Sequence, residues 1–590
     1  MRRSVPRPGG PAGGAWPRRH DGRRSGGAMS SLPRRVPPEP CPVAGRLPAL
    51  VALTAALVLA PCIAEGGPYT QILTDDGVWC WVSDPRALCF GSELVTGWVT
   101  RDGALEAGSL NLLTGSVMTG VLEEAWESDD HDHPAFLRLS DGRCAAFYCR
   151  HSSPGTYLSY RTTVRPEDVS DWGPLREVST NTQGGAGATY AAVSRVPGAT
   201  DQYYVFWRGG DWKPAMSVGT YDPVTTRFSW TEAERLISVF DGRPYCKFTE
   251  CTSNRIGIAF TDGHPGENLN NVYYAEIRGE AGGPAFFRAD GTRIKSVGSA
   301  PLVPAECDTV FDREQAPEEQ GDNAWVWDVA LGDSGVPVVA YVTFPTKSEH
   351  QYHWARFGGS GWSDATLVYD SGGSVADTTI VPQQHYYSGG LALDPRDPGI
   401  CYLSRRNAWG GWDVDRWETT DAGEAWSVSH VALGTSAEHL RPVVPRDAPS
   451  GLDVVLMLCG RYDFFRNEPP EDPSVYHYDT SILAWKRWAD SAVPDAHESI
   501  GCLVGVPNPF RDATTISFEL PQPGSVDLCV YDVGGRRVRD LMRGERLTAG
   551  PHRVSWDGRD DGGRRVASGV YFVRADVGGR AQVRRVSLVR

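Results

Sequence analysis

The sequence predicts an all-β protein, and three observations lead to that prediction. Short runs of alternating apolar residues recur between Gly, Asp, Pro and Asn turns from about residue 69 to residue 504. No stretch keeps a 3.6-residue apolar period over the length of a helix. Aromatic residues, Gly and Pro are abundant (20 Trp, 22 Tyr, 18 Phe, 66 Gly and 43 Pro), as expected for many strands joined by tight turns.

Residues 1–64 are expected to direct export. Residues 1–47 contain ten arginines and only two acidic residues, and the apolar run 47–60 ends in small residues. A basic flank, an apolar core and small residues at the cut are the pattern of a secretory signal peptide, and the run is short for a membrane span. Met29 is an alternative start, because residues 1–28 are low-complexity sequence. We therefore expect a secreted or cell-surface protein.

The rest of the chain is acidic. It carries 48 basic and 71 acidic residues after the N-terminal segment. Such a surface excludes nonspecific binding to nucleic acid and opposes long-range attraction of a polyanion. An anion-binding site in this chain must therefore depend on local Arg and His side chains.

Eleven cysteines follow residue 64. Cys80 and Cys89 flank a predicted turn at residues 83–85, so a disulfide between them is one expectation. No CxxC pair occurs, so a zinc ribbon is not indicated. We expect mainly buried thiols with one or two disulfides.

One motif indicates the architecture of residues 69–504. Residues 419–426 read TTDAGEAW and match the Asp-box pattern S/T-x-D-x-G-x-x-W. In this pattern the Asp and Gly form a tight hairpin turn and the Trp packs beneath it, a device that recurs in the blades of β-propellers. More than 400 residues exceed a single sandwich, and at roughly 50–60 residues per blade the length predicts seven blades.

Residues 505–590 differ in composition from the preceding region. They contain 15 Arg and no Lys, and their strand-like runs are short and closely spaced. Such a segment predicts a small Ig-like β-sandwich. The expected order is thus residues 1–64 for export, a seven-bladed β-propeller at 69–504 and a sandwich at 505–590.

The densest group of chemically capable side chains is DDHDHP at residues 129–134, followed by YCRH at 148–151. A strand, a turn and a second strand separate His131 from His151, so the two imidazoles can meet at one end of a hairpin. Neighbouring imidazoles and carboxylates suit proton transfer or a metal held by Asp130, His131 and His133. A purely structural role, in which the histidines cap turns, is the third interpretation.

A second group lies on the next predicted hairpin. Tyr190 begins one strand and Arg208 ends the following one. Together with the histidines they match the needs of β-elimination from a uronic acid. Arg208 would neutralise the carboxylate and acidify the adjacent proton, and His131 or Tyr190 would remove that proton, with one of them protonating the departing oxygen.

The order of these motifs resembles the BNR-repeat β-propeller family that contains the ulvan lyases. The shared segments run over most of residues 74–430 and include DDHDHP, YCRH, TY at 189–190, FWRG at 206–209 and TDGHP at 261–265. The resemblance implies His131, Tyr190 and Arg208 as catalytic residues, with His151 in support. Asp132 departs from it, because the lyases more often have Asn there. Residues 505–590 resemble the FlgD-like Ig-type and sorting domains of secreted bacterial proteins, which implies contact with secretion machinery or the cell surface.

Several further side chains are candidates for binding. His133 and Arg150 are expected to contact substrate beside the histidines, and Arg405 and Arg406 are expected to hold sulfate or carboxylate groups. His264, with Cys246 and Cys251 upstream, is a weak candidate for a structural metal, either zinc or calcium. The proposed chemistry itself needs no cofactor.

The sequence leaves three functions in competition. The first is a lyase that cleaves an acidic, ulvan-like polysaccharide by β-elimination. The second is a noncatalytic glycan-binding propeller at the cell surface. The third is a sialidase-like glycoside hydrolase, which the missing Arg triad disfavours. We expect a monomer with an acidic polysaccharide as its partner and no nucleic acid.

Overall fold

The computed structural model describes residues 69–590 apart from the following stretches: 152–156, 181–186, 268, 318–320, 322, 347–348, 368–375, 378–385, 408–410, 433–437, 463–477, 489–503, 507, 521–522, 534, 549 and 578–579. The export segment 1–64 and Met29 lie outside the described residues. Within them the secondary structure is β-strand, with two short 3-10 helices, η1 (Asp130–Asp132) and η2 (Pro304–Glu306). The all-β prediction is therefore confirmed. No helix in this part of the chain is long and apolar enough to cross a membrane.

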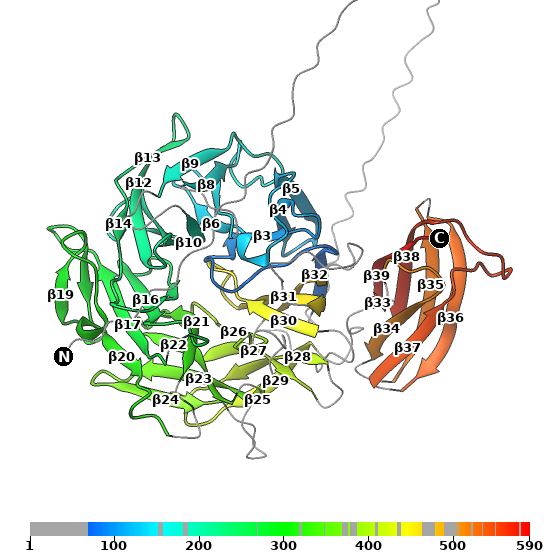
Figure 1. The fold of residues 1–590 in the computed structure, drawn as a ribbon. Coiled ribbons are helices and arrows are strands. Elements are labelled where there is room, and N and C mark those ends of the chain that lie inside the picture. Colours follow the sequence, from blue (N-terminus) through cyan, green and yellow to red (C-terminus); the bar gives the residue numbers. More distant parts are fainter. Residues whose placement is uncertain are drawn as a thin grey trace, which may run out of the picture. The chain divides into compact units, whose positions relative to one another are not determined.

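Six sheets follow one another along residues 69–488 (Figure 1). Three of them use residues 87–235, in chain order. Their strands are β2 (Ala87–Phe90), β3 (Glu93–Val99), β4 (Leu105–Asn111) and β5 (Val117–Glu123); β6 (Ala135–Arg138), β7 (Cys144–Tyr148), β8 (Tyr157–Thr162) and β9 (Arg176–Ser179); and β10 (Ala188–Arg195), β11 (Gln202–Gly209), β12 (Pro214–Asp222), β13 (Arg227–Trp230) and β14 (Glu234–Arg235).

The remaining three sheets have six, five and eight strands. Their strands are β15 (Cys246–Phe248), β16 (Arg255–Thr261), β17 (Val272–Arg278), β18 (Ala285–Phe287), β19 (Arg293–Ser296) and β20 (Asp308–Phe311); β21 (Ala324–Ala330), β22 (Val338–Thr346), β23 (Glu349–Phe357), β24 (Trp362–Thr366) and β25 (Ala376–Asp377); and β1 (Tyr69–Thr74), β26 (Leu391–Leu393), β27 (Ile400–Arg406), β28 (Trp412–Glu418), β29 (Ser427–Ala432), β30 (Glu438–Val443), β31 (Leu452–Tyr462) and β32 (Tyr478–Trp488).

Consecutive sheets pack face to face, because the middle strands are apolar on both sides. In β11, Phe206 and Trp207 point to opposite faces, and each enters a different hydrophobic core. Phe206 stacks on Phe248 of the following sheet with ring centroids 4.2 Å apart. The outer strand β5 is instead mostly exposed, and only Gly120 and Leu122 of it are buried. Two-sided burial explains why the inner strands read as continuous apolar runs.

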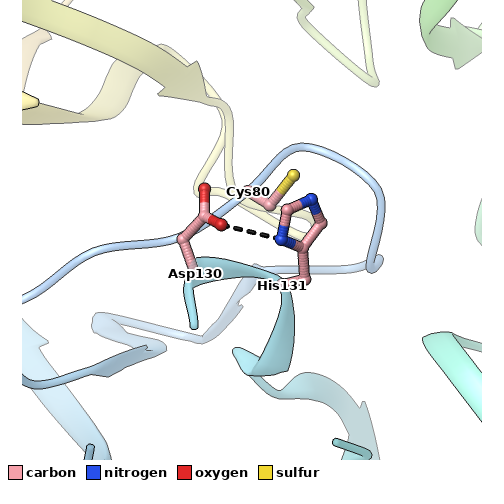
Figure 2. Close-up of side chains that lie close together, drawn as sticks. All are labelled: Cys80, Asp130 and His131. Atoms are coloured by element: carbon pink, nitrogen blue, oxygen red, sulfur yellow. Dashed lines mark ion pairs between the residues drawn. The ribbon is translucent and has the colours of Figure 1, made fainter. Parts of the chain in front are cut away.

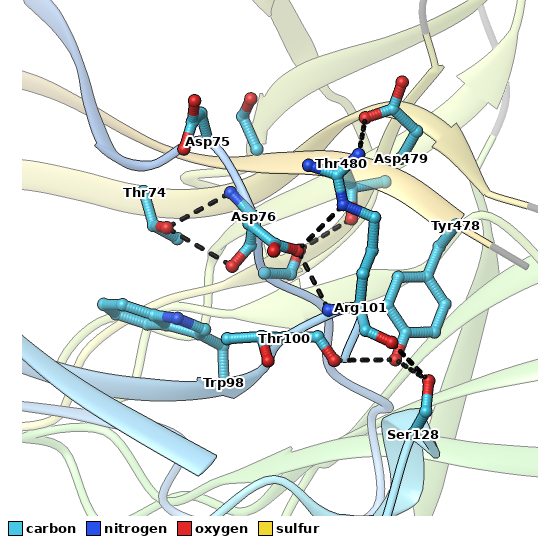
Figure 3. Close-up of polar contacts among 12 residues, drawn as sticks. Thr74, Asp75, Asp76, Trp98, Thr100, Arg101, Ser128, Tyr478, Asp479 and Thr480 are labelled. Carbon is cyan, nitrogen blue, oxygen red and sulfur yellow. Dashed lines mark hydrogen bonds and ion pairs between the residues drawn. The ribbon is translucent and has the colours of Figure 1, made fainter. Parts of the chain in front are cut away.

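The first and last strands of this region pair with each other. β1 is hydrogen-bonded antiparallel to β32, so residues 69–74 complete a sheet formed by residues near 480. Arg101 strengthens this junction, because its guanidinium contacts Asp76 at 3.2 Å and Asp479 at 3.0 Å (Figure 3). The Tyr478 hydroxyl also lies 3.0 Å from the Ser128 hydroxyl. The first and last strands of residues 69–488 are thus joined to each other close to the loop that carries His131.

The Asp-box adopts the turn that its sequence predicts. It joins β28 to β29, and Asp421 accepts a hydrogen bond from the backbone N–H of Ala425 at 2.9 Å. Gly423 has a φ of 98°, a left-handed conformation that favours glycine. The ring of Trp426 packs against Trp354, with centroids 5.4 Å apart. The motif is a folding element, as expected.

Residues 504–588 form two sheets around their own hydrophobic core. The core contains Phe518, Val530 and Trp556, each buried. One sheet has three strands and the other has four: β33 (Val504–Val506), β34 (Thr514–Leu520) and β37 (Gly550–Trp556); and β35 (Gly524–Asp532), β36 (Arg537–Leu547), β38 (Gly569–Val577) and β39 (Arg580–Leu588).

Most cysteines in the described part of the chain are thiols. Cys80 and Cys89 are both free and buried, so the predicted disulfide between them is wrong. Cys89 lies on β2 and pairs in register with Leu94 of β3. Cys459 is disulfide-bonded. The expectation of mainly buried thiols therefore describes this region well.

Candidate active site

The DDHDHP segment forms a buried turn between β5 and β6. Asp129 caps η1 by accepting the backbone N–H of His131 at 3.0 Å, the usual role of Asp at a helix start. A Cβ at Gly97 of β3 would lie 2.5 Å from the ring of Pro134, so glycine is required for the turn to pack this closely. Local capping and close packing thus fix the position of the His131 side chain.

Asp129 brings His131 and His151 together. Its two carboxylate oxygens lie 2.7 Å from Nδ1 of His131 and 2.8 Å from Nδ1 of His151. The two imidazole rings stack with centroids 4.2 Å apart. The strands β6 and β7 form the hairpin expected between them, and the backbone N–H of His151 donates to Asp132 at 2.7 Å. The predicted convergence of the histidines is present.

The two histidines differ in charge. Burial opposes the charged form of His131, but the electrostatic contributions of Cys80 and Asp130 outweigh burial and raise its pKa well above the usual value. Burial and the neighbouring positive charge of His131 lower the pKa of His151. At neutral pH His131 is therefore an imidazolium, and His151 is a neutral imidazole. Because Nδ1 of His151 donates to Asp129, its Nε2 carries the free lone pair.

Tyr190 approaches His151 from the next sheet. The β10–β11 register shifts between Thr189 and Ala192, and such a bulge redirects a side chain. Tyr190 also has a φ of 64°, a strained backbone conformation for a bulky residue. Its hydroxyl lies 3.4 Å from Nε2 of His151. Burial raises the pKa of Tyr190 well above its usual value, so its phenol stays protonated.

Arg208 lies against the other side of Tyr190. Its guanidinium carbon is 4.2 Å from the centre of the Tyr190 ring, and its Nη1 donates to the Tyr245 hydroxyl at 3.0 Å. Arg208 is 5% exposed, and the described residues give it no carboxylate partner. A buried cation without an anion is costly, which makes this position suited to an anionic ligand.

His264 belongs to this neighbourhood and does not form a metal site with the cysteines. Its ring is 5.6 Å from that of Tyr245, and its Nδ1 accepts the backbone N–H of Gly266 at 2.9 Å. Burial and nearby arginines lower its pKa to about 3, so His264 is neutral with its proton on Nε2. No group of clustered metal-ligand atoms in the described residues joins His264 to Cys246 or Cys251. Sequence proximity did not bring these three side chains together.

Two other groups of side chains have the donor atoms of a metal site. They are Cys80 with Asp130 and His131 (Figure 2), and Asp129 with His131 and His151. In the first, one oxygen of Asp130 lies 2.8 Å from Nδ1 of His131, and the other accepts the Tyr462 hydroxyl. The Asp130 carboxylate is thus already engaged by the His131 ring and the Tyr462 hydroxyl. The arrangement fits a charged imidazolium better than a divalent cation.

Arg441 adds a buried positive charge beneath the same loop. Its guanidinium lies 4.4 Å from the centre of the Trp81 ring and 5.5 Å from that of Tyr387. It is 1% exposed, and its guanidinium nitrogens have no hydrogen-bond partner among the described residues. The aromatic faces stabilise the cation, and its charge acts on Asp130. A second cation at this depth further disfavours a divalent ion next to Cys80.

Three of the expected substrate-binding residues are buried or make contacts within the protein. His133 is 1% exposed, and burial lowers its pKa to about 3, so it is a neutral residue without surface for a sugar. Arg150 lies over the ring of Trp126 at 4.3 Å. Arg405 is engaged by the buried carboxylates of Asp413 and Asp415, at 3.3 and 2.7 Å, and balances their charge.

Arg406, the neighbour of Arg405 on β27, is exposed and points to the opposite face of the strand. A contact of either arginine with sulfate or carboxylate stays a prediction of the sequence.

Comparison with known proteins gives two family matches. Residues 95–368 match the BNR repeat-containing family, and residues 508–579 match the FlgD Ig-like domain. The chain carries a BNR-repeat segment and a FlgD Ig-like domain. Both resemblances expected from the sequence are confirmed. The BNR-repeat segment contains the four residues His131, His151, Tyr190 and Arg208.

Solved structures share the fold of the BNR-repeat segment. One is a family PL25 polysaccharide lyase, an ulvan lyase bound to -[GlcA(1-4)Rha3S]-, and another is the same kind of enzyme described without that ligand. Each matches with a TM-score of 0.51 and 14% identity, over 71% of this chain and 95% of the other. No curated protein matches the chain.

Sequence reasoning missed four side chains of this site. Asp129 lies within the DDHDHP motif, but the motif does not show its position between the two imidazoles. Tyr245 and Arg243 follow a glycine-containing turn and carried no motif, although a second arginine close to an aromatic residue is a weak signal of anion binding. Arg441 could not be found from sequence, because only folding places it beneath residues 81 and 130.

Proposed function

We propose that the chain is a polysaccharide lyase that cleaves a uronic-acid-containing, ulvan-like polysaccharide by β-elimination. The observation that carries this proposal is the meeting of three side chains. A neutral His151, a protonated Tyr190 and a buried Arg208 without a carboxylate partner lie within one cluster. A base, an acid and a site for an anion are what elimination beside a carboxylate requires.

In the proposed reaction, Arg208 binds the uronate carboxylate and stabilises the charge that develops when C5 loses its proton. Nε2 of His151 takes that proton. The C5–H electron pair becomes the C4=C5 double bond, the C4–O bond breaks, and the Tyr190 hydroxyl protonates the leaving oxygen. The products are an unsaturated uronate and a new hydroxyl on the departing sugar, and no cofactor takes part.

This assignment gives His131 a positioning role. The resemblance implied His131 as base, but its Nδ1 faces the carboxylates of both Asp129 and Asp130, at 2.7 and 2.8 Å, and its raised pKa favours an imidazolium, which has no lone pair to accept a proton. His131 instead balances the charge of Asp129, which orients the His151 ring and fixes its tautomer. We therefore propose His151 as the base and His131 as its support.

The wider architecture supports the same proposal. The eight-stranded sheet contains two four-stranded halves joined by a single parallel bridge, Trp412 to Glu438. Counting these halves separately gives seven sheets in sequence, closed by β1 on β32, as in a seven-bladed propeller. We propose a propeller for residues 69–504 and an Ig-like sandwich for 505–590.

We also propose that the chain is exported. The basic and apolar residues before position 65 would direct secretion, and the FlgD Ig-like domain would engage secretion machinery or the cell surface. The proposed partner is an acidic polysaccharide, and the chain is proposed to act on it as a monomer. A structural zinc or calcium ion remains a separate prediction of the sequence.

The test is product analysis with purified protein. Uronate-containing polysaccharides are incubated with the wild-type chain, and ultraviolet absorbance of the unsaturated product is followed. Arg208→Ala should lower the rate by about 10²- to 10³-fold, as expected when a main electrostatic contact is lost. Arg227→Ala, at an exposed position on β13, is the matched control and should keep the wild-type rate. Full activity of Arg208→Ala would contradict the site.

The same assay separates the other candidate functions. New reducing ends without the unsaturated product would identify a glycoside hydrolase. Binding without either product would identify a glycan-binding propeller, and elimination by the wild-type chain would exclude that alternative.

A further inference from the structure

Trp212 is an exposed aromatic residue in a strained position next to Arg208. It lies in the turn between β11 and β12, where Gly209 and Lys213 pair through a backbone hydrogen bond of 2.9 Å. Its side chain is 49% exposed, and its φ is 65°. A bulky residue with a left-handed backbone is an outlier, and glycine would remove the strain. Such strain is found where a side chain has a function.

Contacts on both sides hold this turn in place. Asp211 forms an ion pair with Arg235, and the ammonium group of Lys213 donates to the backbone carbonyl of Gly242. Arg235 lies on β14 of the same sheet, and Gly242 lies on the segment that leads to β15. Trp212 is therefore presented to solvent by a rigid turn.

Arg243 shares both Trp212 and Tyr245 with Arg208. The guanidinium carbons of Arg208 and Arg243 each lie 4.7 Å from the centre of the Trp212 ring. Nη2 of Arg243 donates to the Tyr245 hydroxyl at 2.7 Å, and Arg208 donates to the same oxygen at 3.0 Å. Two cations thus converge on one phenol. Among the described residues, the only carboxylate that forms an ion pair with either arginine is that of Glu267, whose side chain is 51% exposed and contacts Arg243.

Phe240 is a second exposed aromatic residue in this part of the chain. It is fully exposed and lies two residues before Gly242, on the loop that Lys213 contacts. Exposed aromatic rings beside cationic groups match a sugar that carries an acidic substituent, because the ring covers the apolar face of the sugar and the cation binds the acid.

We propose that Trp212 and Arg243 form an outer subsite for the sugar adjoining the uronate at Arg208. The apolar face of that sugar lies on Trp212, and its sulfate or carboxylate group binds Arg243. The inference rests on the proposed function for the position of the uronate, and it adds a second acidic sugar to the substrate. The ligand is thus an acidic chain of at least two units with charges on both.

The test measures binding and turnover separately. Affinity electrophoresis in gels containing uronate polysaccharide gives binding of the full chain whether or not it is cleaved. Trp212→Ala and Trp212→Gly should weaken binding by about tenfold, from the loss of one aromatic contact. Trp212→Phe should retain most of it. Where cleavage is seen, the substitutions should raise KM and leave kcat within about twofold.

Stability distinguishes a binding residue from a structural one. If Trp212 serves binding, Trp212→Gly relieves backbone strain, and its thermal midpoint should equal or exceed that of the wild type. A lowered midpoint together with unchanged binding would overturn the inference.

The acidic substituent is tested with paired polysaccharides. Arg243→Ala should weaken binding to a uronate polymer carrying sulfate more than to its desulfated form if sulfate is the bound group. An equal loss on both polymers identifies the second group as a carboxylate. Unchanged binding of Arg243→Ala to both overturns the subsite. If Trp212→Ala cleaves the polysaccharide with the kinetics of the wild type, the subsite is refuted and the lyase proposal is not. If the wild type binds the polysaccharide but does not cleave it, the lyase proposal is refuted and the subsite is not.

Discussion

Asp129 connects the two histidines, and its replacement by asparagine tests the proposed division of roles between them. The wild-type carboxylate is 0% exposed and accepts the Nδ1 protons of His131 and His151 at 2.7 and 2.8 Å. Asparagine keeps the shape but offers one oxygen and one NH₂ group in place of two oxygens. One imidazole must then face a donor. The substitution therefore changes the tautomer of a histidine while removing almost no volume.

The size of the effect follows from these contacts. If the NH₂ group faces His151, Nδ1 becomes the acceptor and Nε2 carries the proton, so the proposed base has no lone pair toward the substrate. General base catalysis contributes about 10²- to 10⁴-fold, so kcat should fall within that range. Losing two charge-assisted hydrogen bonds should also lower the free energy of unfolding by about 3–5 kcal/mol.

Two measurements separate these effects. Histidine ¹⁵N NMR reports the tautomer of His151, and formation of unsaturated product reports kcat at a temperature where the variant is folded. Asp129→Glu keeps both oxygens and serves as the control, with activity between that of the wild type and that of Asp129→Asn. A folded Asp129→Asn variant with kcat within threefold of wild type would refute the role given to His151.

Three further predictions concern pH and stability. Because the pKa of His151 is lowered, kcat/KM should stay constant from neutral pH to below 6.5 and then fall as His151 gains a proton; a decline that begins above 6.5 would contradict this. The pKa of His131 is raised in the folded state, so its ion pair should stabilise the fold fully below pH 6.5. This stabilisation should disappear as the pH rises through the raised pKa, and the free energy of unfolding in urea, measured across this pH range, tests the expectation. Arg101→Ala leaves Asp76 and Asp479 without their shared cation and should lower the free energy of unfolding by about 2–3 kcal/mol, whereas a loss below 0.5 kcal/mol would show that the junction of β1 and β32 does not depend on it.

Local patterns in the sequence predicted much of the fold. Alternating apolar runs and turn residues are short-range signals, so the strands and the Asp-box turn at residues 419–426 could be anticipated. The convergence of His131 with His151 was predictable for the same reason, because one hairpin separates them. The link between β1 and β32 depends on residues about 400 positions apart, and no local pattern reports it.

The errors arose where charge pairing or burial decides the role of a residue. Arg405 is a residue of a type that often binds anions, but two buried aspartates on the neighbouring strand β28 neutralise its charge. His133 belongs to the same motif as His131, but the turn directs it inward. The pKa of His131 is raised by Cys80, about 50 residues away, together with Asp130, Tyr190 and Asp129. These properties follow from three-dimensional surroundings that the sequence does not display.

The most direct test of the central claim is to run the reaction in ¹⁸O-labelled water and to measure the masses of the products by mass spectrometry. β-Elimination breaks the C4–O bond without adding water, so the account predicts an unsaturated fragment with no solvent oxygen, formed by the wild-type chain and lost in Tyr190→Phe. Hydrolysis would instead place one labelled oxygen in a saturated fragment. Labelled, saturated products, or undiminished elimination by Tyr190→Phe, would contradict the proposed site.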